Sequence, residues 1–328
     1  MQILVTGGAG YIGSHCVKHL RTCGHEVVVV DNLSVGHRAA VPAEHLYALD
    51  IADTDRLDDL LSTFRIEAVL HFAADAAVGE SVVHPAKYYR NNVVNALTLL
   101  ELVRVRGIGK FLFSSTCATY GLPEAMPITE ATPQRPINPY GRSKLMFEQM
   151  LMDYAAAYGL GVTALRYFNA AGAAADGSLG EDHTPETHLI PLVLQVALNQ
   201  RPNIHVFGTD YDTPDGTCIR DYIHVDDLAA AHEQALHAIR PGEFEAYNVG
   251  TGRGYSVREV IRTAEAVTGK PIAVVEAPRR PGDPPILVAA ADKIRTRLGW
   301  SPKYPELRPI VESAWRWHRT HPNGYATE

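Results

Sequence analysis

The sequence runs Gly7-Gly8-Ala9-Gly10-Tyr11-Ile12-Gly13 directly after its first apolar segment, Ile3–Val5. That segment predicts a buried strand, and the amphipathic residues at about 12–22 predict a helix. One glycine of this spacing can form the tight turn, one can let the backbone approach a pyrophosphate, and one can let helix and strand pack closely. The helix N-terminus then offers free N–H groups to an anion. The pattern predicts a dinucleotide site, although any tight strand-to-helix turn could use the same glycines.

The N-terminal half alternates short β-branched segments with longer amphipathic ones. Expected strands lie at 3–5, 26–30, 68–71, 110–114 and 162–167, and expected helices at about 12–22, 53–64, 86–106 and 139–158. The second half is less regular, with a helix expected at about 189–199 and strands at 204–207, 221–225 and 246–249. Strands that alternate with helices indicate βαβ units. We therefore predict an α/β fold, a Rossmann-type doubly wound parallel sheet with a smaller mixed α/β C-terminal substrate domain.

Composition excludes several classes of protein. The 328 residues are 46% hydrophobic, with 30 basic and 37 acidic side chains and a net charge of −7, which argues against nucleic acid or a membrane as the main partner. The four cysteines lie far apart without a C-x-x-C pair, which argues against disulfides and fits a cytoplasmic location. No apolar run reaches the roughly 18 residues of a membrane span, and the first residues do not resemble a secretion signal.

Asp31 immediately follows the second expected strand. A carboxylate at that strand end can accept hydrogen bonds from both ribose hydroxyls of an adenosine and would repel a 2′-phosphate. NAD is therefore favoured over NADP, with a simple loop aspartate as the alternative. Asp50-Ile51, at the end of the third strand, could border the adenine, which is a weak indication by itself.

A pair of polar side chains opens the helix expected after Pro139. Tyr140 and Lys144 are four residues apart and share one helix face. A phenol has a pKa of about 10, which a nearby ammonium and a positively charged nicotinamide would lower. Tyr140 could then take a proton from a carbinol while hydride passes to NAD, with Lys144 on the nicotinamide ribose. An ordinary surface pair is the alternative.

Thr116 ends the segment Phe113-Ser114-Ser115-Thr116, where a parallel sheet opens towards its ligands. It can hydrogen-bond the reacting hydroxyl and relay a proton to Tyr140, although polar residues also simply terminate strands. Each of these features is a weak signal by itself. Together and in this order along the chain, the glycine turn, Asp31, the Ser/Thr strand end and the Tyr-x-x-x-Lys pair specifically indicate an NAD-dependent active site.

With these motifs the chain resembles the extended short-chain dehydrogenase/reductase family, and within it the UDP-sugar 4-epimerases. The resemblance spans nearly the whole chain and is strongest at 6–15, 78–82, 113–116, 139–144, 166–169, 220–225 and 279–283. It implies an isomerase of galactose metabolism that interconverts UDP-galactose and UDP-glucose through a 4-keto-hexose. It also implies an NAD-binding domain over 1–169 and a nucleotide-sugar domain over 170–328, with segments near 221–250 returning to the first.

The resemblance also implies site residues, with Thr116, Tyr140 and Lys144 as the catalytic group. NAD would contact Gly7, Gly10, Tyr11, Ile12, Gly13, Asp31, Asn32, Leu33, Ser34, Gly36, Asp50, Ile51, Phe72, Ala73, Ala74, Asn91, Thr116, Tyr140, Lys144 and Phe168. The UDP-sugar would contact Thr116, Tyr140, Asn169, His188, Leu189, His205, Val206, Phe207, Arg220, Arg280 and Asp283. Planar guanidinium donors suit diphosphate oxygens, so Arg220 and Arg280 would clamp the diphosphate, with loop charge as the alternative, and Asp283 would bind the uridine ribose.

Two positions depart from the family pattern or leave the substrate open. Ala76 stands where many members carry a lysine that reaches the pyrophosphate, which puts that contact in doubt. Leu287 occupies a gatekeeper position, where a large tyrosine restricts the pocket to plain hexoses and a small residue admits N-acetyl groups. Leucine is intermediate, so a 4-epimerase of UDP-N-acetylglucosamine or UDP-glucuronate is the alternative.

Other functions find less support in the residues. Related dehydratases and decarboxylases place a carboxylate just after the Ser/Thr, where this chain has Cys117 and Ala118. A plain reductase would form NADH, and a non-catalytic NAD sensor would not need Tyr140 and Lys144. His183 and His188 lie in a loop without further ligand spacing, so no metal site is predicted.

The expected helices 86–106 and 139–158 carry more apolar residues than one sheet face needs. We expect them to pair across a two-fold axis into a homodimer, with ordinary core as the alternative. The residues concerned are Leu99, Leu100, Val103, Met146, Met150 and Leu151.

Overall fold

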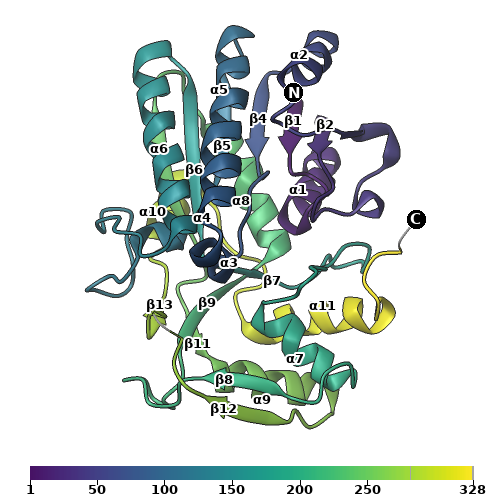
Figure 1. Cartoon of the computed structure of the whole chain (residues 1–328), viewed down its shortest axis with the longest axis vertical. Helices are drawn as coiled ribbons and strands as arrows, with labels where there is room; N and C mark the ends of the chain where they lie inside the picture. The colour runs from purple at the N-terminus through teal and green to yellow at the C-terminus, as the bar shows by residue number, and fades with distance from the viewer. Residues whose placement is uncertain (281, 327–328) are drawn as a thin grey trace.

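A seven-stranded sheet forms the larger part of the molecule. It is seen in a computed structural model that describes residues 1–280 and 282–326 (Figure 1). The strand order is β10-β6-β5-β4-β1-β2-β3, and all neighbouring pairs are parallel. The bounds are β1 Gln2–Thr6, β2 Glu26–Asp31, β3 Leu46–Ala48, β4 Ala68–His71, β5 Lys110–Thr116, β6 Gly161–Tyr167 and β10 Phe244–Val249. The order reverses between β1 and β4, which is where such sheets bind ligands beyond the strands' carboxyl ends. The predicted Rossmann-type fold is confirmed.

Two helical layers cover this sheet, and the strands are therefore apolar on both faces. Ile3 and Val5 pack into one core together with helices α1 and α8, whereas Leu4 packs into a second core with α2, α5 and α6. These helices are α1 Tyr11–Thr22, α2 Thr54–Thr63, α5 Ala96–Val105, α6 Pro139–Tyr158 and α8 Val225–Ala238. Successive side chains of a strand point to opposite faces, so a strand buried on both sides is a continuous apolar run.

The helix expected over 86–106 is instead composed of consecutive segments. These are α4 Pro85–Tyr89, a π-helical stretch η3 Arg90–Asn95 and α5, preceded by α3 Val78–Val83. Asn92 of the π-helical stretch accepts a hydrogen bond from the Asp75 backbone N–H at 2.9 Å and donates to Ser143 Oγ at 3.0 Å. It thereby fastens the loop after β4 to helix α6. Such π-helical turns are frequent at functional sites.

A smaller part lies below the main sheet in Figure 1. Its strands are β7 Asn169–Ala171, β8 Ile204–Phe207, β9 Ile219–His224, β11 Gly254–Ser256, β12 Val274–Ala277 and β13 Ile286–Leu287. Its helices α7 Leu189–Ala197, α9 Val257–Thr268 and α11 Leu307–Thr320 share a core of their own. Between these segments the chain returns to the main sheet, because β10 pairs with β6 and α8 packs against α1.

Short elements complete the described chain. They are η1 Arg38–Ala40, η2 Ala43–His45, η4 Cys117–Tyr120 and α10 Asp292–Leu298, the last of which packs on β10. Within residues 1–280 and 282–326, no helix combines the length and the apolar character that a membrane span needs.

Candidate active site

The glycine turn between β1 and α1 has the shape of an anion cradle. A Cβ at Gly13 would lie 2.2 Å from Gly7 O, and one at Gly7 would lie 2.4 Å from Ala73 N, so both positions are closed to side chains. A Cβ at Gly10 would meet only Gly7 O, at 3.4 Å, so this side of the turn is open. The N-cap of α1 receives no side-chain hydrogen bond, and no acidic residue lies in its first turn. Free N–H groups and the helix dipole therefore point at an open surface, which fits a dinucleotide pyrophosphate.

Asp31 lies beside this turn at the end of β2. Its Oδ2 accepts a hydrogen bond from Ala9 N at 2.9 Å and its Oδ1 accepts one from Leu33 N at 2.8 Å. Burial raises the pKa of this carboxyl, and the backbone hydrogen bonds oppose that shift. Asn32 Nδ2 donates to Asp50 Oδ2 at 2.8 Å, which links the ends of β2 and β3. The structure thus brings the predicted adenosine residues together.

Phe72, Ala73 and Asn91, which were also predicted to contact the cofactor, lie along the same edge of the sheet. Ile51 lies in the core instead. Phe72 and Ala73 both donate their backbone N–H to Thr6 O, at 2.8 and 3.1 Å, which joins the ends of β4 and β1. Asn91 Nδ2 donates to Asp75 Oδ2 at 3.1 Å. Ile51 is 4% exposed within the core under the sheet, so its side chain is a packing residue.

The start of α6 brings the predicted catalytic residues to the end of β5. Asn138 caps the helix by accepting a hydrogen bond from Gly141 N at 2.8 Å. A Cβ at Gly141 would lie 2.5 Å from Ala118 O, so glycine lets the helix approach the turn after β5. The Thr116 side chain consequently lies near the Tyr140 phenol and favours its ionised form. Both hydroxyls lie at the edge of the sheet to which the glycine turn belongs.

Lys144 is buried, and its Nζ donates to Ser114 O at 2.9 Å. Burial lowers the pKa of Lys144 to about 7, although Glu148 opposes this shift. Burial also raises the pKa of Tyr140 to about 12, against the effect of the Thr116 side chain. Lys144 is not among the groups that shift the pKa of the phenol in the protein alone. The expected lowering of that pKa, which includes the charge of the nicotinamide, stays a prediction.

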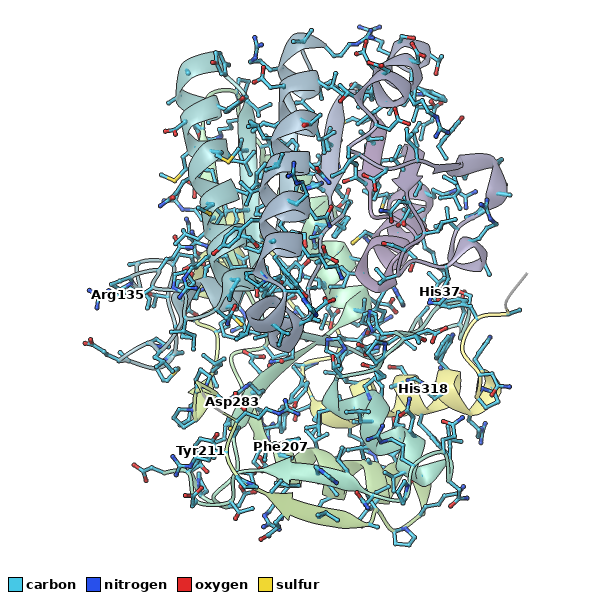
Figure 2. All side chains as sticks on the ribbon, viewed as in Figure 1. His37, Arg135, Phe207, Tyr211, Asp283 and His318 are labelled. Atoms are coloured by element: carbon cyan, nitrogen blue, oxygen red, sulfur yellow. The ribbon has the colours of Figure 1, made fainter. Side chains whose placement is uncertain are left out.

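The predicted nucleotide-sugar residues gather in the smaller part of the molecule. Arg220 on β9 forms an ion pair with Asp283, and Arg280 stacks 4.0 Å from the ring centroid of Phe207. Figure 2 shows Phe207, Tyr211 and Asp283 in this region. Asn169 Nδ2 donates to Asp221 O at 2.9 Å, which fixes β7 to β9.

The pleat of β8 separates the three predicted sugar-side residues His205, Val206 and Phe207 onto its two faces. Val206 is 1% exposed and packs in the core of the smaller part, so its side chain is not available to a ligand. His205 and Phe207 point to the other face, with ring centroids 6.0 Å apart.

Leu287 pairs with Arg220 across the β13–β9 ladder. It also packs against the cluster that contains Tyr120, Phe168 and Cys117. It therefore stands between the predicted diphosphate residues and the predicted nicotinamide neighbour, a position from which a side chain can limit the space for a sugar.

Comparison with known proteins agrees with this geometry. Residues 3–250 match the NAD dependent epimerase/dehydratase family. The chain belongs to this family. It is 53% identical to the UDP-glucose 4-epimerase of Halalkalibacterium halodurans over 100% of this chain and 98% of that one. The crystal structure of UDP-glucose 4-epimerase from Brucella ovis in complex with NAD has 50% identity and a TM-score of 0.92, covering 96% of this chain and 97% of that one. The enzyme from Bifidobacterium longum in complex with NAD+ and UDP has 39% identity and a TM-score of 0.94, covering 99% and 100%.

A buried ion pair that was not predicted from the sequence lies behind the predicted catalytic residues of this NAD-dependent epimerase/dehydratase family member. Glu148 lies one helical turn beyond Lys144 and accepts three hydrogen bonds from Arg166 of β6, of 3.0, 3.2 and 2.5 Å. Ser115 donates to the same carboxylate. Glu148 continues the spacing of Tyr140 and Lys144 on one helix face, which is the one signal that could have revealed it.

In this family member, Gly13→Ala tests the glycine cradle. The added methyl would overlap the carbonyl of Gly7 and the Cα of Gly8, 2.2 and 2.8 Å away. Overpacking against backbone costs about 1–3 kcal/mol, so we expect a lower Tm and at least tenfold weaker NAD binding by titration calorimetry. The matched control is Gly109→Ala, where a Cβ meets nothing within 4 Å. An unchanged NAD affinity in Gly13→Ala would contradict the assignment.

Proposed function

We propose that the protein interconverts UDP-galactose and UDP-glucose by oxidising the sugar at C4 and reducing it again on the other face, with NAD bound throughout. The placement of Tyr140 beside Thr116, at the sheet edge that carries the glycine cradle, is the observation on which this rests. Full-length relatives of about half-identical sequence are named UDP-glucose 4-epimerase. Because the leucine at position 287 is intermediate in size between a tyrosine and a small residue, 4-epimerisation of another UDP-sugar is the second candidate.

In the proposed mechanism, separate residues transfer the proton, bind the cofactor and hold the diphosphate. When bound, oxidised nicotinamide accepts a hydride from C4 and returns it. Tyr140 takes the C4 hydroxyl proton and gives it back, with the Thr116 side chain beside the phenol. Lys144, held by the Ser114 carbonyl, is placed beside the catalytic pair and can bind the nicotinamide ribose. Arg220 and Arg280 hold the diphosphate while the 4-keto sugar, gripped less firmly, turns between the oxidation step and the reduction step.

The same proposal assigns NAD to residues 1–169 and the nucleotide sugar to residues 170–328, with the returning strand β10 and helix α8 completing the cofactor side. It keeps the expected cytoplasmic location, which rests on four cysteines without a disulfide pattern.

A coupled assay on UDP-galactose, run beside UDP-N-acetylgalactosamine, tests the function. We expect conversion of UDP-galactose to UDP-glucose without net formation of NADH, because hydride returns to the sugar. Conversion of the N-acetyl substrate alone would favour the second candidate. No turnover by NAD-loaded protein would overturn the proposal and favour a sensor.

We further propose that the protein is a homodimer joined through helices α5 and α6, which lie side by side (Figure 1). The residues first assigned to this contact are mostly wrong. Leu99, Leu100, Val103 and Leu151 are fully buried in the chain's own core, and Met150 packs against that core. Met146 is 46% exposed, however, and Val94 and Leu97 add apolar surface on the neighbouring helical run. Three large apolar side chains exposed on neighbouring helices are typical of an interface.

The double variant Leu97→Glu/Met146→Glu tests this dimer. Light scattering should show a dimer for the natural protein and a monomer for the variant, because charges would be buried without partners. The control is Val274→Glu on β12, which is 40% exposed and lies in the smaller part. If the natural protein is a monomer at micromolar concentration, the homodimer proposal is wrong.

A further inference from the structure

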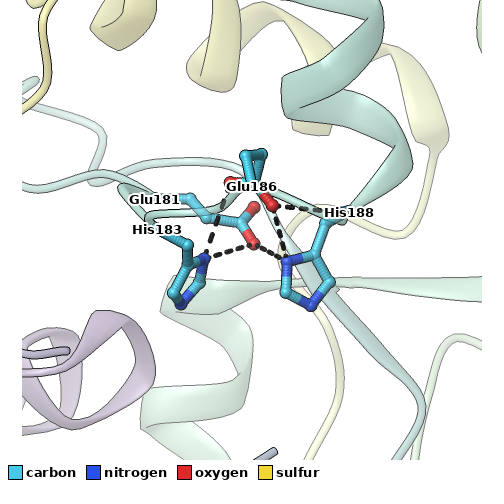
Figure 3. Close-up of side chains that lie close together, drawn as sticks. All are labelled: Glu181, His183, Glu186 and His188. Atoms are coloured by element: carbon cyan, nitrogen blue, oxygen red, sulfur yellow. Dashed lines mark hydrogen bonds and ion pairs between the residues drawn. The ribbon is translucent and has the colours of Figure 1, made fainter. Parts of the chain in front are cut away.

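Four metal-binding side chains converge in the loop that leads into α7. They are Glu181, His183, Glu186 and His188, and one donor atom from each lies within 4.8 Å of all the others (Figure 3). From the sequence only His183 and His188 stood out as possible ligands, since the loop has no regular ligand spacing. The fold adds two carboxylates to them.

We infer that these four side chains bind one divalent transition-metal ion, with zinc as the ion that fits best. Imidazole and carboxylate are both zinc ligands, with bonds of about 2.0–2.2 Å. A tetrahedral site with such bonds separates its ligand atoms by about 3.3–3.6 Å. His188 Nδ1 lies 2.9 Å from Glu181 Oε1 and from Glu186 Oε1, and His183 Nδ1 lies 3.5 Å from one oxygen of each carboxylate. The distances between ligand atoms in the cluster, 2.9 and 3.5 Å, thus lie on either side of the shortest distance expected for tetrahedral zinc.

Hydrogen bonds within the protein leave this cluster incomplete. His183 Nδ1 is buried and has no hydrogen-bond partner, although it faces two carboxylate oxygens. His188 Nδ1 faces two oxygens at equal distance, and one N–H cannot point at both. The side chains of Glu181 and Glu186 are only 4% and 7% exposed, so their mutual repulsion is poorly screened. A cation between the four groups would satisfy all of them.

Backbone groups already hold one ligand in place. Thr187 N and His188 N donate to Glu186 Oε1 at 2.6 and 2.7 Å, which leaves Oε2 facing His183. Outer partners of this kind orient metal ligands and strengthen binding. The side chain of His188 is 56% exposed, so an ion can enter from solvent.

The site would join the two parts of the molecule. The ring of Tyr11, from the glycine turn, meets His183 edge-on with centroids 6.3 Å apart. His188 is the N-cap of α7, at the start of the predicted sugar-side segment. A metal here would tie the loop 181–188 between the cofactor turn and α7, which is a structural role.

Two other clusters in the described chain are weaker candidates. His19, Cys23 and Glu233 form one, and His25, Glu233 and His237 form the other, so both depend on Glu233 and offer three ligands each. His237 already binds Glu233 at 2.8 Å within one helix turn. They serve as the matched control.

Metal analysis of the purified full chain tests the inference, followed by calorimetric titration of chelator-treated protein with ZnCl2. We expect one equivalent of zinc and a lower Tm after chelation. His183→Ala and Glu186→Gln should each weaken zinc binding by more than about tenfold, whereas His237→Ala should bind it like the natural protein. Cobalt bound to the natural protein should give the visible absorption of a tetrahedral site, a measurement that needs no variant.

Three results would overturn the inference. The first is no zinc uptake, which would mean that two imidazolium–carboxylate pairs hold the cluster together without a metal. The second is zinc uptake that survives both substitutions, and the third is loss of zinc binding in His237→Ala. None of these readouts depends on the proposed epimerase activity.

Discussion

Tyr140→Phe lowers turnover of UDP-galactose by about 10²–10⁴-fold while NAD stays bound, because the substitution removes the proton acceptor and almost no volume. The ring packs edge-on against Tyr88 with centroids 6.5 Å apart, and phenylalanine keeps that contact. The Thr116 hydroxyl stays at the end of β5, where it accepts a hydrogen bond from Ala118 N at 3.1 Å.

The measurement is kcat by the coupled assay, with the NAD content of the same sample determined after denaturation. Tyr158→Phe, near the C-terminal end of the same helix and 58% exposed, is the matched control and should keep its turnover. Retained turnover in Tyr140→Phe would refute the proton-transfer role. Loss of NAD along with turnover would instead assign Tyr140 to cofactor binding.

The protein's own groups leave the phenol weakly acidic. Burial raises the pKa of Tyr140 to about 12, so the phenol is neutral near pH 7. Burial lowers the pKa of Lys144 to about 7, so the amine is only partly protonated there. A positive charge beside the phenol favours the phenolate, and oxidised nicotinamide carries such a charge. The reaction therefore needs the cofactor for its charge as well as for its hydride chemistry.

The parallel sheet could be predicted because its strands are short apolar runs that stay apolar on both faces, as Ile3-Leu4-Val5 does. Helices α8, α9 and α11 were not anticipated. For α9 the signals were present, since Ser256 and Glu259 form a capping box and Gly269 ends the helix. The π-helical stretch 90–95 has no comparable signature, because it depends on how Asn92 is held between two other segments.

The part of the candidate site that lies along one edge of the sheet could be predicted from the sequence. Thr116 ends a strand and Tyr140 begins a helix, and both positions meet at the carboxyl edge of the sheet. Arg166 and Glu181 were not recognised, because their partners are chosen by tertiary packing that no spacing along the chain reveals. Val206 was assigned to the sugar pocket by resemblance, yet the pleat of β8 turns its side chain into the core.

Arg166→Met destabilises the protein by about 3–5 kcal/mol, because it leaves the Glu148 carboxylate buried without its counter-charge. The two side chains are only 6% and 1% exposed. Arg166 also donates to Tyr120 OH at 2.9 Å, and that hydroxyl donates to Asn248 Oδ1 at 2.7 Å, so the substitution loosens contacts that join β6, β10 and the turn after β5. Glu148 opposes the lowering of the Lys144 pKa, which places this network directly behind the proposed catalytic lysine.

Denaturant unfolding measures this effect, and an exposed pair supplies the control. Arg308 Nε donates to Glu312 Oε1 at 2.7 Å, with side chains 61% and 43% exposed, so Arg308→Met should cost no more than about 1 kcal/mol. The double variant Glu148→Met/Arg166→Met should be more stable than the sum of the two single changes predicts, since it removes both charges together. Equal costs for Arg166→Met and Arg308→Met would show that burial of the Glu148–Arg166 pair carries no special energetic weight. In that case the position of Lys144 would depend on its hydrogen bond to Ser114 and on helix packing alone.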